Sequence, residues 1–243
     1  MGAVVWLLAR GTERLGYNWQ WYQVPKTLFQ FENGRFIPGP LLLGLMVTLR
    51  ITAWSLILAT IIGLVTALLR LSDSFIARMV ARGYVETIRN IPLLVIIFFF
   101  YFVMAPILDL GRFFTAVLAL SLFEGAYASE IFRAGIVSIH RGQWEAAHSL
   151  GLTVFDTYRW VILPQAIRRV LPPLTSQGIS LIKDSALVST IAVYELTMQG
   201  RSIIAETFLT FEIWFTVAAI YLVITVTLSF IVYIMENRFK VVD

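Results

Sequence analysis

Long apolar stretches alternate with polar connections along the 243 residues of this chain. The apolar stretches cover residues 41–69, 93–108, 113–139, 170–193 and 213–235. A helix needs about 20 mainly apolar residues to cross about 30 Å of hydrocarbon. Each stretch reaches that length or nearly does, and the second, which is short alone, extends backwards to about Tyr84. The pattern predicts an all-α membrane protein with five transmembrane helices.

The overall composition supports a lipid environment. Hydrophobic residues make up 58% of the chain and charged residues only 14%, and the mean hydropathy is +0.80. A soluble domain has about a quarter charged residues and just under half apolar ones. The chain therefore has too few polar side chains to cover the outside of a soluble fold, so its apolar surface faces lipid.

Residue usage also limits the chemistry. The sequence has no cysteine, which excludes disulfides and cysteine-based metal sites. Two histidines, His140 and His148, have no carboxylate cluster around them, and we expect no histidine-based metal site. The net charge of +4 would suit nucleic acid, but in a membrane protein such an excess is typical of the cytoplasmic side. We therefore expect no nucleic acid partner.

The distribution of Lys and Arg predicts the orientation. The connections at residues 70–91 and 133–169, together with the C-terminal tail, hold more of these residues than the opposite side does. This excess places them in the cytoplasm, with the N-terminus outside and the C-terminus inside. Residues 1–39 are rich in Trp and Tyr, which favour the headgroup zone, so we expect an interfacial or extracytoplasmic segment there. Residues 40–243 form the predicted transmembrane domain.

The first cytoplasmic connection has helical charge spacing. Arg78, Arg82, Glu86 and Arg89 are four, four and three residues apart, which places them on one face of a helix. We interpret this segment as an amphipathic helix that leads into the bilayer as an interfacial elbow with a structural role.

The connection at about residues 138–165 is too apolar to be disordered and too long for a simple turn. Residues 144–147 (Trp-Glu-Ala-Ala) favour a short helix with small side chains, and Gly151 is placed to end it through a left-handed cap. We expect this helix to offer its small-residue face to another protein.

The spacing within this loop resembles the EAA loop of bacterial ABC importer permeases. Glu-Ala-Ala at 145–147 is followed by three residues, Gly151, nine residues and Val-Ile-Leu-Pro at 161–164. The family pattern ends in I-x-L-P, so this chain departs only at Val161. The resemblance implies that the short helix docks into a cleft of an ATPase subunit. The residues that would carry this coupling are Glu145, Ala146, Ala147, Gly151, Leu163 and Pro164.

Three further segments narrow the resemblance. Residues 84–94, 124–136 and 181–189 are similar to stretches of polar amino acid permeases, and the similarity extends over about residues 40–240. This implies a type I ABC importer permease in the bacterial inner membrane. Its partners would be an ATPase dimer, a second identical or homologous permease, an extracytoplasmic substrate-binding protein and a polar amino acid. The chain has no P-loop pattern, so ATP and Mg²⁺ would bind the partner ATPase, and we expect neither a cofactor nor enzymatic chemistry here.

Ionisable side chains within the predicted spans are candidates for the substrate path, because burying one in hydrocarbon costs several kcal/mol unless it is paired or faces water. Glu124 lies ~16 Å into the third span, and Lys183 and Asp184 are central in the fourth. A zwitterion needs a cation or N–H donors for its carboxylate and an acceptor for its ammonium. We hypothesise that Glu124, Tyr127, Lys183, Asp184 and Ser185 line the path. An equally weighted interpretation is that Lys183 pairs with Asp184 or Glu124 only to hold helices together.

The sequence leaves one further ion pair and three alternative functions to consider. Glu130 and Arg133 are spaced as a helical ion pair, to which we assign a structural role. A membrane-embedded enzyme would need a catalytic constellation, and none is seen. An ATP-independent transporter or channel is a further alternative, although the sequence shows no internal repeats or paired broken helices. A structural assembly factor would not need the docking helix.

Overall fold

The computed structural model describes residues 17–32 and 34–239. The part of the predicted outer segment before residue 17 lies outside the described residues. In chain order the elements are η1 (Trp21–Gln23), α2 (Val24–Leu28), β1 (Phe29–Glu32), β2 (Arg35–Pro38), α3 (Pro40–Leu71), α4 (Phe75–Arg89), α5 (Leu93–Phe99), η2 (Phe100–Met104), α6 (Ala105–Leu108), α7 (Arg112–Val137), α8 (Arg141–Ser149), α9 (Val154–Asp156), η3 (Thr157–Ile162), α10 (Leu163–Asp184), η4 (Ser185–Ile191), α11 (Leu196–Thr207) and α12 (Thr210–Phe239).

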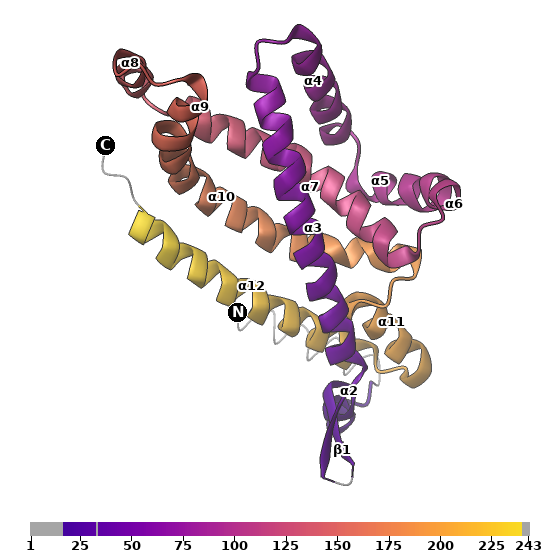
Figure 1. Ribbon diagram of the computed structural model, residues 1–243. Coiled ribbons are helices and arrows are strands. Elements are labelled where there is room, and N and C mark those ends of the chain that lie inside the picture. Colours follow the sequence, from indigo (N-terminus) through magenta and orange to yellow (C-terminus); the bar gives the residue numbers. More distant parts are fainter. Residues whose placement is uncertain (1–16, 33, 240–243) are drawn as a thin grey trace.

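The long helix α3 runs through the molecule from one end to the other (Figure 1). The short helices α8 and α9 lie at one end together with the tip of α4, while the β1–β2 hairpin and α11 lie at the opposite end. Helix α7 packs extensively along α3, and α10 packs on α7 and on α12. The fold is therefore a bundle in which α7 and α10 occupy the middle.

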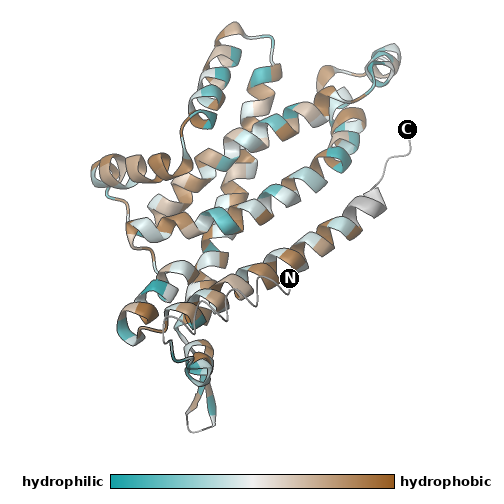
Figure 2. Ribbon diagram, turned by 180° about the vertical axis from the view of Figure 1, so that it is seen from behind, coloured by the Kyte–Doolittle hydropathy of each residue, from teal (hydrophilic) through white to brown (hydrophobic). Residues whose placement is uncertain are grey.

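Three helices in the described residues are individually long and apolar enough to cross a membrane. They are Pro40–Leu71, Arg112–Val137 and Thr210–Ile234, which correspond to the first, third and fifth predicted spans. Figure 2 shows α12 as largely hydrophobic along its length. Most of its apolar side chains stay exposed in the single chain, as expected of a helix that meets lipid or another subunit.

The second predicted span is not one helix. Helices α4 and α5 meet at an angle of 107°, so the backward extension to Tyr84 as a continuous span was wrong. The break lies at Asn90–Pro92, where Asn90 caps α4 and Pro92 precedes α5. Proline has no N–H to donate and disfavours helical backbone at the residue before it. The bent pair adds at most a fourth span to the three straight ones.

The fourth predicted span differs in its limits. Helix α10 begins at Leu163 rather than near residue 170, and it ends at Asp184, beyond which the chain tightens into the 3-10 helix η4. Polar and charged residues make α10 too hydrophilic to be classed as a span from composition alone. The region is helical, as predicted, but the count of five crossings is not established by helix length and hydropathy.

The hairpin is an exception to the all-α prediction. Strands β1 and β2 are antiparallel, with Phe31 opposite Phe36 and Glu32 opposite Arg35. Phe29 alternates with Phe31 along β1, as the period of a strand requires, and Gly34 adopts the left-handed backbone of the turn with φ +75°. The three phenylalanines contact one another at centroid distances of 5.8–6.3 Å.

The start of the described chain is anchored to α12. The Glu212 carboxylate is fully buried and accepts hydrogen bonds from the Gln20 N–H at 2.7 Å and from the Tyr17 hydroxyl. Burial and the contact with Glu212 raise the pKa of Tyr17 to about 12, so this hydroxyl stays a donor at physiological pH.

Small residues let the central helices approach closely. A Cβ added to Gly63 of α3 would lie 2.6 Å from the Ala128 Cβ of α7, and one added to Gly125 would lie 2.8 Å from Ile62. On another side of α7, a Cβ at Gly135 would overlap Val170 of α10 at 2.2 Å. Helix association in lipid relies on such close packing because the bilayer supplies no hydrophobic drive between helices.

We expect Gly63→Leu to lower the melting temperature of the detergent-solubilised protein, measured by size-exclusion chromatography of heated samples. The added side chain would have to displace the α7 backbone, and overpacking of this kind costs about 1–3 kcal/mol. Gly83→Leu is the matched control, because open space surrounds Gly83 on α4. Equal melting of both variants and the wild type would contradict the tight α3–α7 contact.

Candidate functional site

Helix α8 carries the Glu-Ala-Ala motif at one end of the molecule. It starts after His140, whose ring Nδ1 accepts a hydrogen bond from the Gly142 N–H at 3.1 Å. Glu145 and Ala146 are exposed, whereas Ala147 is 2% exposed. The motif thus places its first two side chains outward and uses the third to seat the helix.

Gly151 ends the helix as the sequence predicted. Its φ of +72° is left-handed, the Leu152 N–H donates to the Ala147 carbonyl at 3.2 Å, and the Gly151 N–H donates to the His148 carbonyl at 2.9 Å. This is the Schellman arrangement that favours glycine after a helix. A Cβ at Gly151 would meet nothing within 4 Å, so the turn faces open space.

The second half of the motif anchors the loop. Ile162 is fully buried, Leu163 is half-buried, and Pro164 lies in the first turn of α10, directly after η3. The Trp144 ring packs edge-on against Tyr158 at 5.2 Å. Burial and the nearby Asp73 carboxylate raise the pKa of Tyr158.

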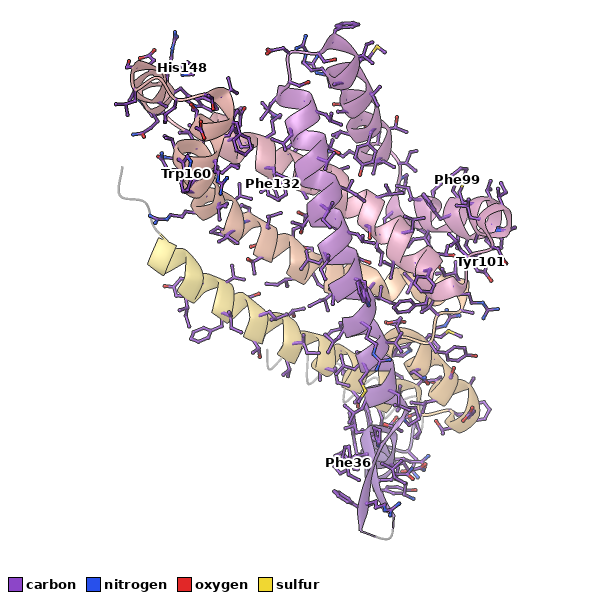
Figure 3. All side chains as sticks on the ribbon, in the orientation of Figure 1. Phe36, Phe99, Tyr101, Phe132, His148 and Trp160 are labelled. Carbon is purple, nitrogen blue, oxygen red and sulfur yellow. The ribbon has the colours of Figure 1, made fainter. Side chains whose placement is uncertain are left out.

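An apolar patch flanks α8 at this end. Its four large side chains are between 65% and 79% exposed, and Figure 3 shows Trp160 together with His148 there. They are Leu150, Val154, Phe155 and Trp160. An exposed cluster of this kind beside a short, outward-facing helix is typical of a protein interface.

A pocket of about 420 Å³ lies between α7 and α10 and receives most of the predicted path residues. Glu124 is 3% exposed, and the Gln177 amide donates to its Oε2 at 2.5 Å and to its carbonyl at 2.7 Å. Gln177 Oε1 is buried and has no hydrogen-bond partner among the described residues. Asp184 and Tyr127 also line the pocket, with the Asp184 carboxyl within interaction range of Glu124. The pocket is therefore rich in acceptors.

The structure separates the other two predicted path residues from this pocket. Lys183 lines a second pocket of about 300 Å³ between α10 and α12. Ser185, the first residue of η4, is fully buried and donates to the Ile182 carbonyl of α10 at 2.6 Å, and it lines neither pocket.

Glu130 joins three helices. Its predicted pair with Arg133 is confirmed at 2.9 Å, and Arg70 of α3 and Arg89 of α4 lie 2.5 and 3.5 Å from the same carboxylate. The Arg89 guanidinium also lies 5.3 Å from the centroid of the Tyr127 ring. Sequence reasoning missed both tertiary partners, although each lies in the last turn of its helix.

Comparison with known protein families determines which family this chain belongs to. The family described as binding-protein-dependent transport system inner membrane component matches residues 31–241. This chain belongs to that family. The permease resemblance inferred from the loop around Glu145 and Gly151 is thereby confirmed.

Permeases of amino acid systems are among the relatives of this permease subunit. The glutamine transport system permease protein GlnP of Escherichia coli K12 is 43% identical over 217 residues, covering 87% of this chain and 99% of GlnP. The L-cystine transport system permease protein TcyB of Bacillus subtilis 168 is 43% identical over 80% of this chain and 84% of TcyB. The glutamate/aspartate import permease protein GltK of Escherichia coli O6:H1 is 34% identical over 87% of this chain and 99% of GltK.

Solved structures agree with the sequence matches. A crystal structure of an amino acid ABC transporter with histidines is 38% identical, with a TM-score of 0.76 over 82% of this chain and 94% of that chain. An inward-facing MetNI methionine ABC transporter, 19% identical, shares the fold with a TM-score of 0.73 over 83% of this chain and 97% of that chain.

These matches identify the chain as a permease subunit of an ABC importer with the type I permease fold. Its homologues are transport subunits rather than enzymes, and the family implies a separate ATPase and a substrate-binding protein. The alternatives of a membrane enzyme, an ATP-independent channel and an assembly factor do not fit this membership.

We expect Glu130→Gln to lower the melting temperature of this permease subunit, because the arginines around it lose their shared carboxylate. A hydrogen bond to a charged group contributes about 1.5–3 kcal/mol, and the Arg70 side chain is only 13% exposed. Glu145→Gln is the control, since its pair with Arg141 is exposed and such pairs contribute less than about 1 kcal/mol. A melting temperature of Glu130→Gln equal to that of the control would contradict the role of this cluster.

Proposed function

We propose that this subunit forms one half of the membrane core of an ATP-driven importer of polar amino acids in the bacterial inner membrane. The outward-facing helix α8, closed by the left-handed turn at Gly151, is the observation that carries the proposal. A short helix with two exposed small or acidic side chains and an open turn suits insertion into a cleft of another protein. That protein is an ATPase subunit, which binds ATP and Mg²⁺ in place of this chain.

The proposed topology has five crossings, with the N-terminus outside and the C-terminus in the cytoplasm. Helices α8 and α4 would then mark the cytoplasmic end and the β1–β2 hairpin the outer end, which agrees with their positions at opposite ends of the molecule (Figure 1). The bent α4–α6 segment supplies the second crossing. Helix α10 supplies the fourth, and its polar side chains can cross the bilayer because they line pockets rather than meet lipid.

The complete importer in this proposal contains two permeases, two ATPases and an extracytoplasmic binding protein. The second permease is a copy of this chain or a homologue. Closure of the ATPases on ATP would draw the two α8 helices together and move the attached α10 helices. The binding protein would deliver the amino acid at the hairpin end.

The acceptor-rich pocket between α7 and α10 suits the ammonium group of an amino acid. Glu124 and Asp184 carry the charge, and the unpaired Gln177 Oε1 adds a neutral acceptor. Relatives named for glutamine, L-cystine and glutamate/aspartate transport support a polar amino acid as the cargo. Tyr127 would contribute the aromatic wall of the path.

We expect Gly151→Asp to abolish co-purification of the ATPase subunit with affinity-tagged permease from native membranes, as measured by quantitative mass spectrometry. The substitution strains a left-handed turn and adds a charge on the open side of α8. Gly34→Asp is the matched control, because Gly34 has the same backbone conformation, with φ +75°, on the distant hairpin.

The proposal requires that the Gly34 variant retain the ATPase at the wild-type level. If the wild-type chain is intact and folded but brings no ATPase with it, the docking role of α8 is wrong. If both variants retain the ATPase equally, the turn at Gly151 does not contribute to docking.

We expect Glu124→Gln to reduce amino acid uptake by about tenfold or more while leaving the folded yield unchanged, since a charge-assisted hydrogen bond is worth about 1.5–3 kcal/mol. Uptake is measured in cells that depend on this importer, and yield by size-exclusion chromatography. Glu206→Gln, an exposed change on α11, is the control. Normal uptake at normal yield would remove Glu124 from the proposed path.

A further inference from the structure

An apolar groove lies between α12 and the start of the described chain. Its walls are η1, α2, the beginning of α3 and one face of α12, and its volume of about 810 Å³ is in the range of ligand sites in proteins. Figure 1 shows α2 at the end of the molecule where α12 begins. Helix α12 packs on α10 and α11 rather than along α3, so this side of it stays open. We call this space the α12 groove, and its lining includes Trp21, Leu28, Leu45, Phe215, Ala219 and Ile224.

The α12 groove offers little to a polar ligand. Among the described residues that line it, Thr216 has the only hydroxyl, and this hydroxyl donates to the Glu212 carbonyl at 2.7 Å. The other lining side chains are aliphatic or aromatic. Phe215 and Val223 are 44% and 64% exposed although they belong to a membrane-spanning helix. Water does not fill apolar spaces of this kind, so the groove needs a hydrocarbon occupant.

The length of the groove matches one leaflet of a bilayer. Helix α12 lines it from Phe215 to Ile224, which corresponds to ~14 Å at 1.5 Å per residue. Half of a hydrocarbon core of about 30 Å is about 15 Å. One turn beyond Ile224, Leu228 lines a different space, which α12 shares with α10 and α3. A transmembrane helix of another subunit would have to continue past this point, whereas an acyl chain ends at the middle of the bilayer.

The beginning of the groove has residues typical of the headgroup zone. The rings of Trp19 and Trp21 stack at a centroid distance of 5.7 Å, and Trp21 lies 6.4 Å from Phe215. Tryptophan favours this zone because its ring is apolar and its N–H is polar. Lys26 is exposed on α2, two residues before Leu28, and its ammonium makes no hydrogen bond or ion pair with the described residues. This free cation is complementary to the phosphate of a lipid.

We propose that the α12 groove binds one acyl chain of a phospholipid from the leaflet at the hairpin end, with the lipid phosphate at Lys26. The bound chain fills the space that protein side chains leave between α2 and α12. Both η1 and α2 precede residue 31, where the match to the permease family begins, so the site is completed by a segment outside that match. The inference goes beyond the proposed import function and is independent of the cargo.

The test uses the full-length permease with its co-purifying subunits, reconstituted with a phosphatidylglycerol that carries a diazirine in one acyl chain. The complex is washed repeatedly in detergent and illuminated, and the retained lipid and its adducts are mapped by mass spectrometry. Ala219→Trp fills the groove, and Ala218→Trp is the matched control because Ala218 is exposed on α12 without lining the groove. Lys26→Gln removes the cation, and Arg201→Gln, an exposed change on α11, is its control.

We expect the wild-type chain to retain one photolipid per permease, with adducts on the groove face at Ala219, Ile220 and Val223. Ala219→Trp should reduce these adducts about tenfold, because the added ring overpacks the space that the acyl chain needs. Ala218→Trp should leave them unchanged. Lys26→Gln should lower retention about fivefold, as expected of one basic side chain near an anionic lipid. Lys26→Arg should retain the lipid, and Arg201→Gln should match the wild type.

Four results would overturn the inference. Adducts that spread equally to Leu222, which is 63% exposed and outside the groove lining, would indicate only the surrounding bulk lipid. Unchanged retention in both Ala219→Trp and Lys26→Gln would contradict the site directly. The chain has no cysteine, so a disulfide between two copies of the Ala219→Cys variant in membranes would assign the groove to the second permease. Retention that begins only after deletion of residues 1–16 would assign it to that segment.

Discussion

The close contact between α3 and α7 positions the pocket that Glu124 lines. In a bilayer, an apolar side chain gains little free energy by moving from lipid into a helix interface. Helices therefore associate mainly through close packing. Gly63 and Gly125 permit that packing on one side of α7, and Gly135 permits α10 to approach on another side. Helix α7 is thereby fixed between two neighbours, and Glu124 is turned into the space that α10 leaves open.

The ionisable side chains of the bundle differ in how far the protein satisfies them. Glu195 is fully buried, yet its carboxylate accepts from the Thr197 and Met198 N–H groups at 2.9 and 2.8 Å and from the Tyr221 hydroxyl at 3.1 Å. It caps α11 and ties it to α12, and burial raises its pKa. Glu130 is satisfied by arginines from three helices. In contrast, Lys183 makes no hydrogen bond or ion pair within the described residues, and its charge acts only on the carboxyl of the adjacent Asp184.

Features of this subunit that depend on the local sequence could be predicted from it. Features that depend on how the helices pack could not. The turn at Gly151 follows from a glycine placed after a helical segment, so the sequence was sufficient to predict helix α8 and its end. The break at Pro92 was also encoded locally, but the predicted span extended the short apolar stretch at 93–108 backwards across it. The convergence of Arg70 and Arg89 on Glu130 depends on helix packing. Adjacent residues on a helix point about 100° apart, and this geometry rather than hydropathy separates Lys183 from Asp184.

Helix α10 connects the loop that carries α8 to both pockets. Its first turn contains Pro164 of the loop motif, and Lys183 lies 19 residues further along the same helix, at about 29 Å for a rise of 1.5 Å per residue. A displacement of α8 therefore reaches the pockets through one covalently continuous element. Pro172 and Pro173 interrupt its internal hydrogen bonds midway, which lowers the cost of bending there. Bending at this point would change the distance of Lys183 from α12 and of Asp184 from α7 together, so that the two pockets open or narrow in a coupled way.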